Sequence, residues 1–219
     1  MIKAVFFDLD GTLVDTDKPI VRAVQLAFTA AGLPKPTAKQ TLKFSGYSTI
    51  NWIDCLLREL QLNHDPHPLA ESMHSILKSD LEKHGSPMAG ARKTLNALKK
   101  RGLRLFVVSN ASEAYLPAGL QRLKLFNYFE DVIGLEKLIV PKPNSISLIN
   151  LISKLGLKPA ECIYVGDTEV DVQYVKGVGN GITLALLKNS RNRDVKADHY
   201  LAKFSDLLNV VPQPHATTN

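Results

Sequence analysis

The 219-residue sequence has only two cysteines and no long apolar run. Cys55 and Cys162 stand far apart in apolar surroundings, which predicts two buried thiols and neither a disulfide nor a zinc site. The apolar runs are much too short to cross a bilayer. Lys3 is followed by only four apolar residues before Asp8, which is short for a secretory signal. We therefore expect a cytoplasmic protein without a membrane partner.

Histidine clusters and the nucleophile elbow of serine hydrolases are also missing. His64 and His67 share a proline-containing loop, but no third metal ligand is in view. The net charge of +6 comes from scattered basic residues, and the densest run, Lys99-Lys100-Arg101, is better explained as a solvated helix end. No nucleic-acid partner is expected, whereas an anionic substrate such as a phosphate ester would suit the charge.

The most informative segment is Asp8-Leu9-Asp10-Gly11-Thr12, which follows the apolar run 4–7. Such a run predicts a buried parallel strand that opens into a loop at the edge of the sheet where ligands bind. Side chains two positions apart project to the same side of a strand, so Asp8 and Asp10 can face one pocket. A divalent cation or a proton would relieve their repulsion. An acidic turn that caps the following helix is the alternative.

The rest of the chain divides into a helical block and an alternating block. Residues 16–85 show helical spacing, with helices expected from about Pro19 to Gly32, 51–62 and 69–83. From Ala89 helices alternate with short apolar strands, expected at 103–108, 132–133, 139–140, 163–165, 182–184 and 199–201. This alternation predicts an α/β fold with a parallel sheet between helices.

The predicted domains follow from this division. Residues 1–15 and 86–210 would form the α/β core. Residues 16–85 would form a helical cap, inserted after the first strand and lying over its carboxyl end. Residues 211–219 contain two prolines and small polar residues, and we expect a flexible tail there.

Three later segments near strand ends carry polar residues suited to a phosphate site. Ser109 and Asn110 can hold phosphate oxygens, or can cap the next helix. Lys142 lies between two prolines, which suits a fixed charge but also an exposed surface turn. Asp167 is placed to meet the first carboxylates, and Asp171 lies one helical turn later on the same side. Asp171 can also form a helix cap with the preceding threonine.

Taken in order, these four segments resemble the four motifs of the haloacid dehalogenase-like superfamily, over about residues 3–205. The resemblance implies a Rossmann-like parallel sheet core. The helical insertion is similar to the commonest cap of that superfamily, and the run Asp8 to Thr16 is most similar to its phosphoglycolate phosphatase branch. Substrate choice in such proteins is made by the cap. The corresponding loop here is 44–48, which can also be a plain connection between helices.

The resemblance also implies roles for the site residues. Asp8 would be the nucleophile that forms an aspartyl phosphate, and Asp10 the general acid and base. Mg²⁺ would be held by the Asp8 carboxylate, the Asp10 backbone carbonyl and Asp167. The remaining residues would bind the phosphoryl group or support the site: Ser109 and the Asn110 backbone on its oxygens, Lys142 offsetting its charge, with Thr12 and Asp171 in support.

These roles imply a magnesium-dependent phosphatase acting on a small phosphorylated metabolite. A carboxylic acid at Asp10, where superfamily dehalogenases have tyrosine, suits the poor leaving group of a phosphate ester. A phosphosugar mutase is an alternative, weakened because Thr12 and Ile20 replace the valine and histidine common in that branch. A non-catalytic binding protein of the same fold is a second alternative, although no motif residue is lost.

Overall fold

A six-stranded parallel sheet forms the centre of the computed structural model, which describes residues 1–179, 181–189, 192 and 195–211. The strand order is β5-β4-β1-β6-β7-β8. The strands are β1 (Ala4–Phe7), β4 (Arg104–Val108), β5 (Asp131–Ile133), β6 (Cys162–Gly166), β7 (Thr183–Leu187) and β8 (His199–Leu201). The first strand therefore lies in the middle of the sheet, where both of its faces are covered.

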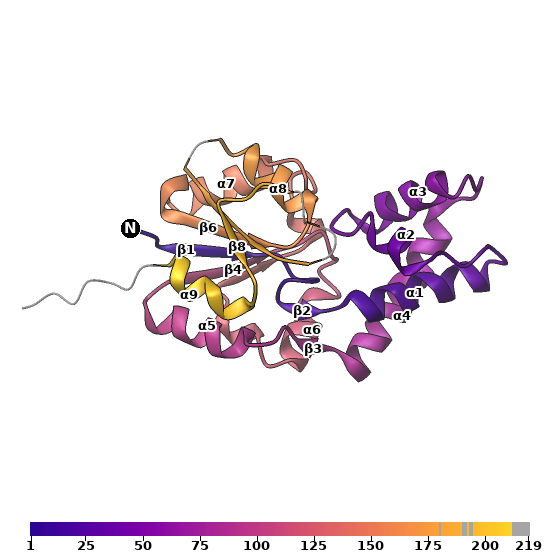
Figure 1. The fold of residues 1–219 in the computed structure, drawn as a ribbon, viewed down its shortest axis with the longest axis horizontal. Coiled ribbons are helices and arrows are strands. Elements are labelled where there is room, and N and C mark those ends of the chain that lie inside the picture. Colours follow the sequence, from indigo (N-terminus) through magenta and orange to yellow (C-terminus); the bar gives the residue numbers. More distant parts are fainter. Residues whose placement is uncertain (180, 190–191, 193–194, 212–219) are drawn as a thin grey trace, which may run out of the picture.

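Helices cover both faces of this sheet (Figure 1). Val5 and Phe7 of β1 pack in one apolar cluster with residues of α5 (Ala91–Lys100), α6 (Leu116–Arg122) and α9 (Leu207–Val210). The alternate residues, Ala4 and Phe6, pack in a second cluster with α7 (Ile146–Lys154) and α8 (Glu169–Lys176). Successive side chains of a strand point to opposite faces, so a wholly apolar strand requires helices on both sides.

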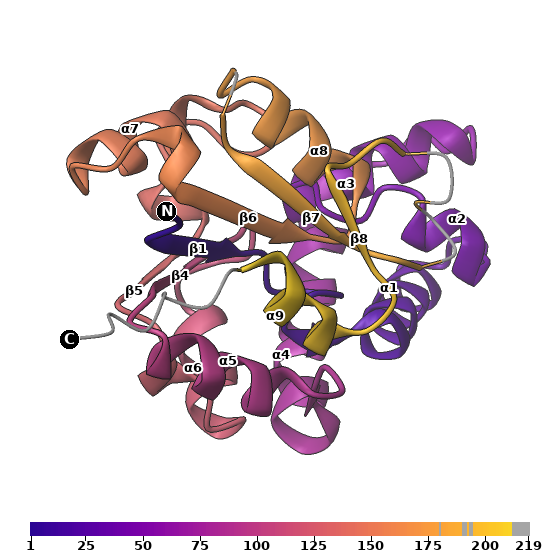
Figure 2. The same ribbon diagram turned by 60° about the vertical axis from the view of Figure 1, so that its left-hand side comes forward.

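Four helices form a separate group at one end of the sheet (Figures 1 and 2). They are α1 (Asp17–Ala30), α2 (Ala38–Leu42), α3 (Thr49–Glu59) and α4 (Pro66–His84). The chain enters and leaves this group through an antiparallel pair of short strands, β2 (Val14–Asp15) and β3 (Ser86–Pro87). The α/β class, the Rossmann-like sheet and the inserted helical cap are thus confirmed. The exact domain limits stay a prediction.

Two local expectations about the elements were wrong. Helix α4 begins at Pro66 and not at Leu69. Prolines are tolerated in the first turn of a helix, because the backbone N–H groups there have no intrahelical hydrogen-bond partner. The expected strand at 139–140 is a bend. There the amide of Val140 donates to the hydroxyl of Ser147 (3.1 Å), and this hydroxyl donates to the Val140 carbonyl (2.8 Å). A side chain therefore takes the place of a neighbouring strand.

The remaining elements are short. The 3₁₀ helices are η1 (Phe126–Tyr128), η2 (Leu135–Lys137), η3 (Pro159–Glu161) and η4 (Phe204–Asp206). Val211, the first residue of the expected tail, is buried, and its carbonyl accepts a hydrogen bond from Arg101 (2.6 Å). Residues 212–219 lie outside the described residues. Within the described ranges, no helix combines the length and the apolar character needed to span a bilayer.

Candidate active site

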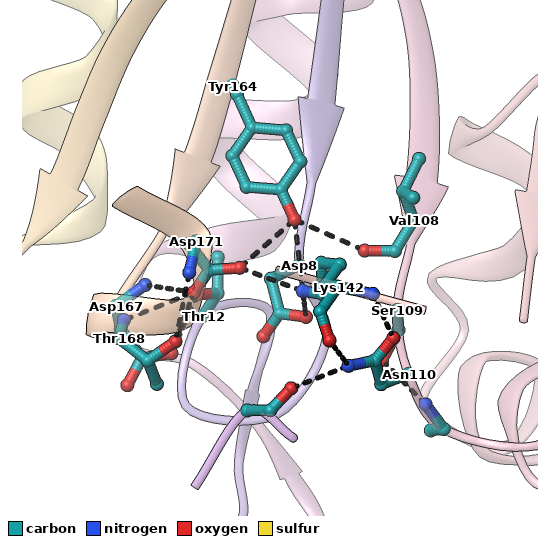
Figure 3. Close-up of polar contacts among 12 residues, drawn as sticks. Asp8, Thr12, Val108, Ser109, Asn110, Lys142, Tyr164, Asp167, Thr168 and Asp171 are labelled. Carbon is teal, nitrogen blue, oxygen red and sulfur yellow. Dashed lines mark hydrogen bonds and ion pairs between the residues drawn. The ribbon is translucent and has the colours of Figure 1, made fainter. Parts of the chain in front are cut away.

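Polar side chains from three strand ends meet beneath the cap (Figure 3). Asp8 follows β1, Ser109 follows β4 and Asp167 follows β6. A cavity of about 50 Å³ lies between the core and the cap. Its lining includes the core residues Asp8, Asp10, Ser109, Asn110 and Tyr115, and the cap residues Ser45, Gly46, Tyr47, Trp52, Met73 and His74. The predicted motifs are therefore brought to one place, at the carboxyl ends of the parallel strands.

The loop after β1 depends on a glycine. Gly11 has a φ of +81°, and a Cβ at this position would lie 2.6 Å from a carboxylate oxygen of Asp167. Only a residue without a side chain combines this conformation with this approach. The resulting tight turn lets both Asp8 and Asp10 line the cavity. The pair faces a pocket, as the first of the two sequence interpretations predicts.

Lys142 is buried at the centre of the site and is not on a surface turn. Its ammonium donates to Asp8 Oδ1 (2.6 Å), Asp171 Oδ1 (2.8 Å) and the hydroxyl of Tyr164 (3.0 Å). These contacts use all three of its protons. Burial alone would lower the pKa of Lys142, but the charges of Asp171 and Asp8 outweigh burial and hold this pKa well above its usual value. The ammonium therefore stays charged beside the Asp8 carboxylate.

Both carboxylate oxygens of Asp171 accept hydrogen bonds from neighbouring protein groups. Besides Lys142, it accepts hydrogen bonds from the backbone N–H of Asp167 (3.2 Å) and from the N–H and hydroxyl of Thr168 (3.1 and 2.7 Å). Burial alone would raise the pKa of Asp171, but Lys142 and these hydrogen bonds lower it. Asp171 thus caps α8 and orients Lys142 at the same time, so both sequence interpretations hold.

Asp8, Asp167 and Asp171 form a buried carboxylate cluster. Their oxygens lie within 4.8 Å of one another. Burial raises the pKa of Asp8 well above its usual value, against the opposing effect of Lys142, and the nearby charges of Asp171 and Asp167 add to the rise. One ammonium cannot balance three carboxylates, whereas the ammonium and a divalent cation together can. Because Asp171 is engaged elsewhere, Asp8 and Asp167 are the residues that fit a hard, oxygen-ligated metal.

Asp167 is held in place by the loop after β7 and by the loop after β1. Thr12 donates its hydroxyl to Asp167 Oδ1 (3.1 Å), and Asn189 donates its amide to Asp167 Oδ2 (3.0 Å). The amide of Asn192 donates to the Asp167 backbone carbonyl (2.9 Å). These contacts fix the direction of the carboxylate, as partners of metal ligands commonly do.

The segment after β4 does not cap the next helix, because α6 begins several residues later, at Leu116. The Ser109 hydroxyl accepts from the Ala111 N–H (3.1 Å), and Ser109 lines the cavity. The Asn110 side chain joins three segments: its Oδ1 accepts from the Lys142 N–H (2.9 Å), and its Nδ2 donates to the carbonyls of Lys142 (2.9 Å) and Gly46 (2.8 Å). Phosphate binding by the Asn110 backbone stays a prediction.

Asp10 has a hydrogen-bond partner that the motifs do not contain. The Tyr115 hydroxyl donates to Asp10 Oδ1 (3.1 Å). Burial raises the pKa of Asp10 to about 6, although the hydrogen bond from Tyr115 opposes this rise. Burial also raises the pKa of Tyr115 well above its usual value, so its hydroxyl keeps the proton that it donates.

Sequence reasoning missed Tyr115, Tyr164, Asn189 and Asn192. The two asparagines follow β7, which runs to Leu187 and so extends past the expected strand 182–184. A search for polar residues after strand ends would have reached them only with the correct end of this strand. The two tyrosines gave no such signal, since a tyrosine among apolar residues is equally typical of a core.

Comparison with known proteins places this site in a family. The model of the haloacid dehalogenase-like hydrolases matches residues 5–185. A phosphoglycolate phosphatase of Aliivibrio fischeri is 30% identical over 81% of both chains, and one of Thiobacillus denitrificans is 28% identical over 89% of this chain and 87% of its own.

Solved structures agree with these relatives. A predicted phosphoglycolate phosphatase of Haemophilus somnus superposes with a TM-score of 0.85 at 22% identity, covering 95% of this chain and 97% of its own. The predicted resemblance to phosphoglycolate phosphatases and the expected class of enzyme, a phosphoric monoester hydrolase, are confirmed. The chain belongs to the haloacid dehalogenase-like hydrolase family.

Proposed function

We propose that this chain is a magnesium-dependent phosphatase that hydrolyses a small phosphomonoester through an aspartyl phosphate on Asp8. One observation carries the proposal: the Asp8 carboxylate lines the cavity with the Lys142 ammonium 2.6 Å from one oxygen and the Asp167 carboxylate within 4.8 Å. A nucleophile, a fixed positive charge and a place for a metal thus meet at one point. Phosphoryl transfer requires little more than this positioning and charge.

The first half of the reaction uses both carboxylates of the loop. Lys142 holds Asp8 Oδ1, which leaves Oδ2 to attack the phosphorus in line. The bond between phosphorus and the ester oxygen breaks, and Asp10 gives this oxygen a proton as it leaves. When bound by Asp8 and Asp167, Mg²⁺ supplies positive charge that offsets the charge of the phosphoryl oxygens. Ser109 donates to one of these oxygens.

In the second half, water replaces the leaving group. Asp10, now ionised, takes a proton from the water as its oxygen bonds to phosphorus, and the bond between phosphorus and Asp8 breaks. The products are phosphate and the free Asp8 carboxylate. Lys142 and Asp171 keep their contacts throughout, so the charges beside Asp8 need no rearrangement.

A two- or three-carbon phosphomonoester of the phosphoglycolate type is the proposed substrate. Curated relatives named phosphoglycolate phosphatase support this choice. The cap also contributes Trp52, Met73 and His74 to the lining of the cavity. Cap side chains would therefore contact the part of the substrate beyond the phosphate.

A phosphate-release screen across phosphoglycolate, sugar phosphates, nucleotides and pyrophosphate, with Mg²⁺ present, tests the proposal. We expect the fastest release from phosphoglycolate. Asp8→Asn should lower kcat by at least about a thousandfold, because an amide is a poor nucleophile and a weaker metal ligand. The matched control is Asp15→Asn on the exposed side of β2, which should keep full activity.

Each alternative gives a different result in the same screen. Interconversion of sugar phosphate isomers without phosphate release would identify a mutase. Magnesium-dependent release retained by purified Asp8→Asn would remove Asp8 from the role of nucleophile. Binding of phosphorylated compounds without turnover of any of them would indicate a non-catalytic protein.

A further inference from the structure

Tyr115 contacts the proposed acid from a part of the chain outside the four motifs. It lies between β4 and α6, is almost fully buried, and lines the cavity. Its hydroxyl donates to Asp10 Oδ1 (3.1 Å), across a sequence separation of 105 residues. The contact therefore joins the loop after β1 to the loop after β4.

The hydrogen bond from Tyr115 restricts the Asp10 carboxyl, which must point toward the leaving group to transfer a proton. A carboxyl group has two oxygens and turns about its own bonds, whereas proton transfer requires one oxygen within hydrogen-bond reach of the leaving group. The hydrogen bond from Tyr115 to Asp10 Oδ1 limits this rotation and favours one orientation of the carboxyl. Loss of the Tyr115 hydroxyl would let the carboxyl rotate while Asp8, Lys142 and Asp167 keep their places.

The cap holds the Tyr115 ring. His74 of α4 packs edge to face against it, with ring centroids 6.1 Å apart and an interplanar angle of 60°. His74 Nε2 also lies 3.0 Å from the hydroxyl of Ser112, and the Ser112 carbonyl accepts from the Tyr115 N–H (3.0 Å). One cap histidine thus touches both the ring and the turn that precedes it. Docking of the cap and placement of the tyrosine are linked through these contacts.

We propose that Tyr115 is a positioning residue that aims the Asp10 carboxyl at the leaving oxygen, with its ring held by His74 of the cap. This inference rests on the proposed phosphatase function. It assigns the hydroxyl of Tyr115 to the orientation of Asp10, which protonates the leaving group in the first half of the reaction. A substrate whose leaving group needs no proton should therefore be insensitive to it.

The test compares two esters with Tyr115→Phe, which keeps the ring and removes the hydroxyl. Phosphoglycolate releases a poor alkoxide that needs an acid, whereas p-nitrophenyl phosphate releases a stable anion. The parameter compared is kcat/KM, since it covers only the steps up to the aspartyl phosphate. We expect kcat/KM to fall about tenfold for phosphoglycolate and less than about twofold for p-nitrophenyl phosphate.

Two further variants make the comparison specific. Tyr128→Phe in η1, outside the cavity lining, should leave both esters unaffected. In an Asp10→Asn background, Tyr115→Phe should cost less than about twofold with either ester, because no acid remains to be oriented. Thermal melting of each variant verifies that the fold is kept.

The possible outcomes distinguish a wrong role for Tyr115 from a wrong proposed phosphatase function. Equal losses with both esters, or no loss with either, would overturn the role of Tyr115 while wild-type turnover still supports the phosphatase. An equal cost of Tyr115→Phe with and without Asp10 would overturn it as well. A wild-type protein that releases phosphate from neither ester would overturn the proposed function, and this inference with it.

Discussion

Asp8 and Asp10 lie two residues apart, yet their neighbours differ in charge. Asp8 contacts the Lys142 ammonium, whereas Asp10 contacts the neutral hydroxyl of Tyr115. Asp10 has a pKa of about 6 and can carry a proton near neutral pH. Asp8 is paired with Lys142, and its carboxylate neighbours fit a metal ion. Two carboxylates with different surroundings can therefore perform different chemistry.

The pKa of Asp10 predicts a measurable effect on stability. This pKa is raised from 3.8 to about 6 by folding, so the contribution is favourable below pH 4 and is lost as the pH rises through 6. Asp10→Asn removes a carboxylate that is costly to ionise there. In metal-free protein we expect Asp10→Asn to raise the free energy of unfolding at pH 7.5, on the order of 2 kcal/mol, and to have little effect at pH 4.

Urea denaturation in EDTA at the two pH values measures this difference. Asp15→Asn, on an exposed side chain, provides the control and should show no gain at either pH. A variant of Asp10 that is less stable than wild type at pH 7.5 would contradict the prediction.

Residues of the site differ in how far the sequence identifies them. Asp8, Asp10, Ser109 and Asp167 come directly after apolar strands, so their meeting follows from the parallel order of the sheet alone. The hydroxyl of Tyr164 donates a hydrogen bond to Asp171 (3.1 Å) and accepts one from the Lys142 ammonium (3.0 Å). Such a contact depends on the rotamer of the tyrosine and on the position of its partners. The spacing of apolar residues in the sequence does not distinguish a tyrosine of the site from a tyrosine of the core.

At the scale of elements, the cap loop 44–48 approaches the core closely at a glycine. Gly46 has a φ of +98°, and a Cβ there would lie 2.7 Å from Thr168 Oγ1 and 3.1 Å from Val170 Cβ. Its carbonyl accepts the hydrogen bond from Asn110 described above (2.8 Å). The loop between α2 and α3 therefore rests on the start of α8 and on the segment after β4. This close approach explains a glycine at the point where cap and core meet.

Gly46→Ala should weaken the docking of the cap more than the fold. We expect KM for phosphoglycolate to rise about tenfold, because the added methyl group pushes the loop away from Thr168. Gly32→Ala is the matched control, since Gly32 also has a positive φ (+70°) but has no atom within 4 Å of the added Cβ. Both variants should lose about 1 kcal/mol of stability from the strained backbone.

Steady-state kinetics and thermal melting of the two glycine variants separate the effects. A KM that rises equally in both would attribute the change to backbone strain. An unchanged KM for Gly46→Ala would mean that the loop 44–48 does not need this approach for substrate binding.

Element types were predictable from the sequence, and element ends were less so. Hydrophobic spacing identified the strands of the sheet because both faces are buried. The short helix α2 was missed, since its stability comes from the hydrogen bonds between Thr37 and Gln40 and not from an apolar stripe. The start of α4 was misplaced because prolines end helices in their interior but suit their first turn.

At the scale of the whole molecule, a chain with a net charge of +6 buries a negative site between core and cap. Binding of a divalent cation at this site should therefore stabilise the folded protein. We expect Mg²⁺ to raise the melting temperature of wild-type protein by several degrees over the value in EDTA, on the order of 2–3 kcal/mol at 100 times Kd. Mg²⁺ would neutralise carboxylates that otherwise repel one another in the folded state.

Asp167→Asn tests whether this site is responsible. The variant should melt at a higher temperature than wild type in EDTA, because one buried charge is gone, and should no longer respond to Mg²⁺. NaCl at equal ionic strength controls for general screening, and Asp15→Asn should respond to Mg²⁺ as wild type does. A magnesium response retained by Asp167→Asn would place the ion elsewhere, whereas its loss ties metal binding to the carboxylates beneath the cap.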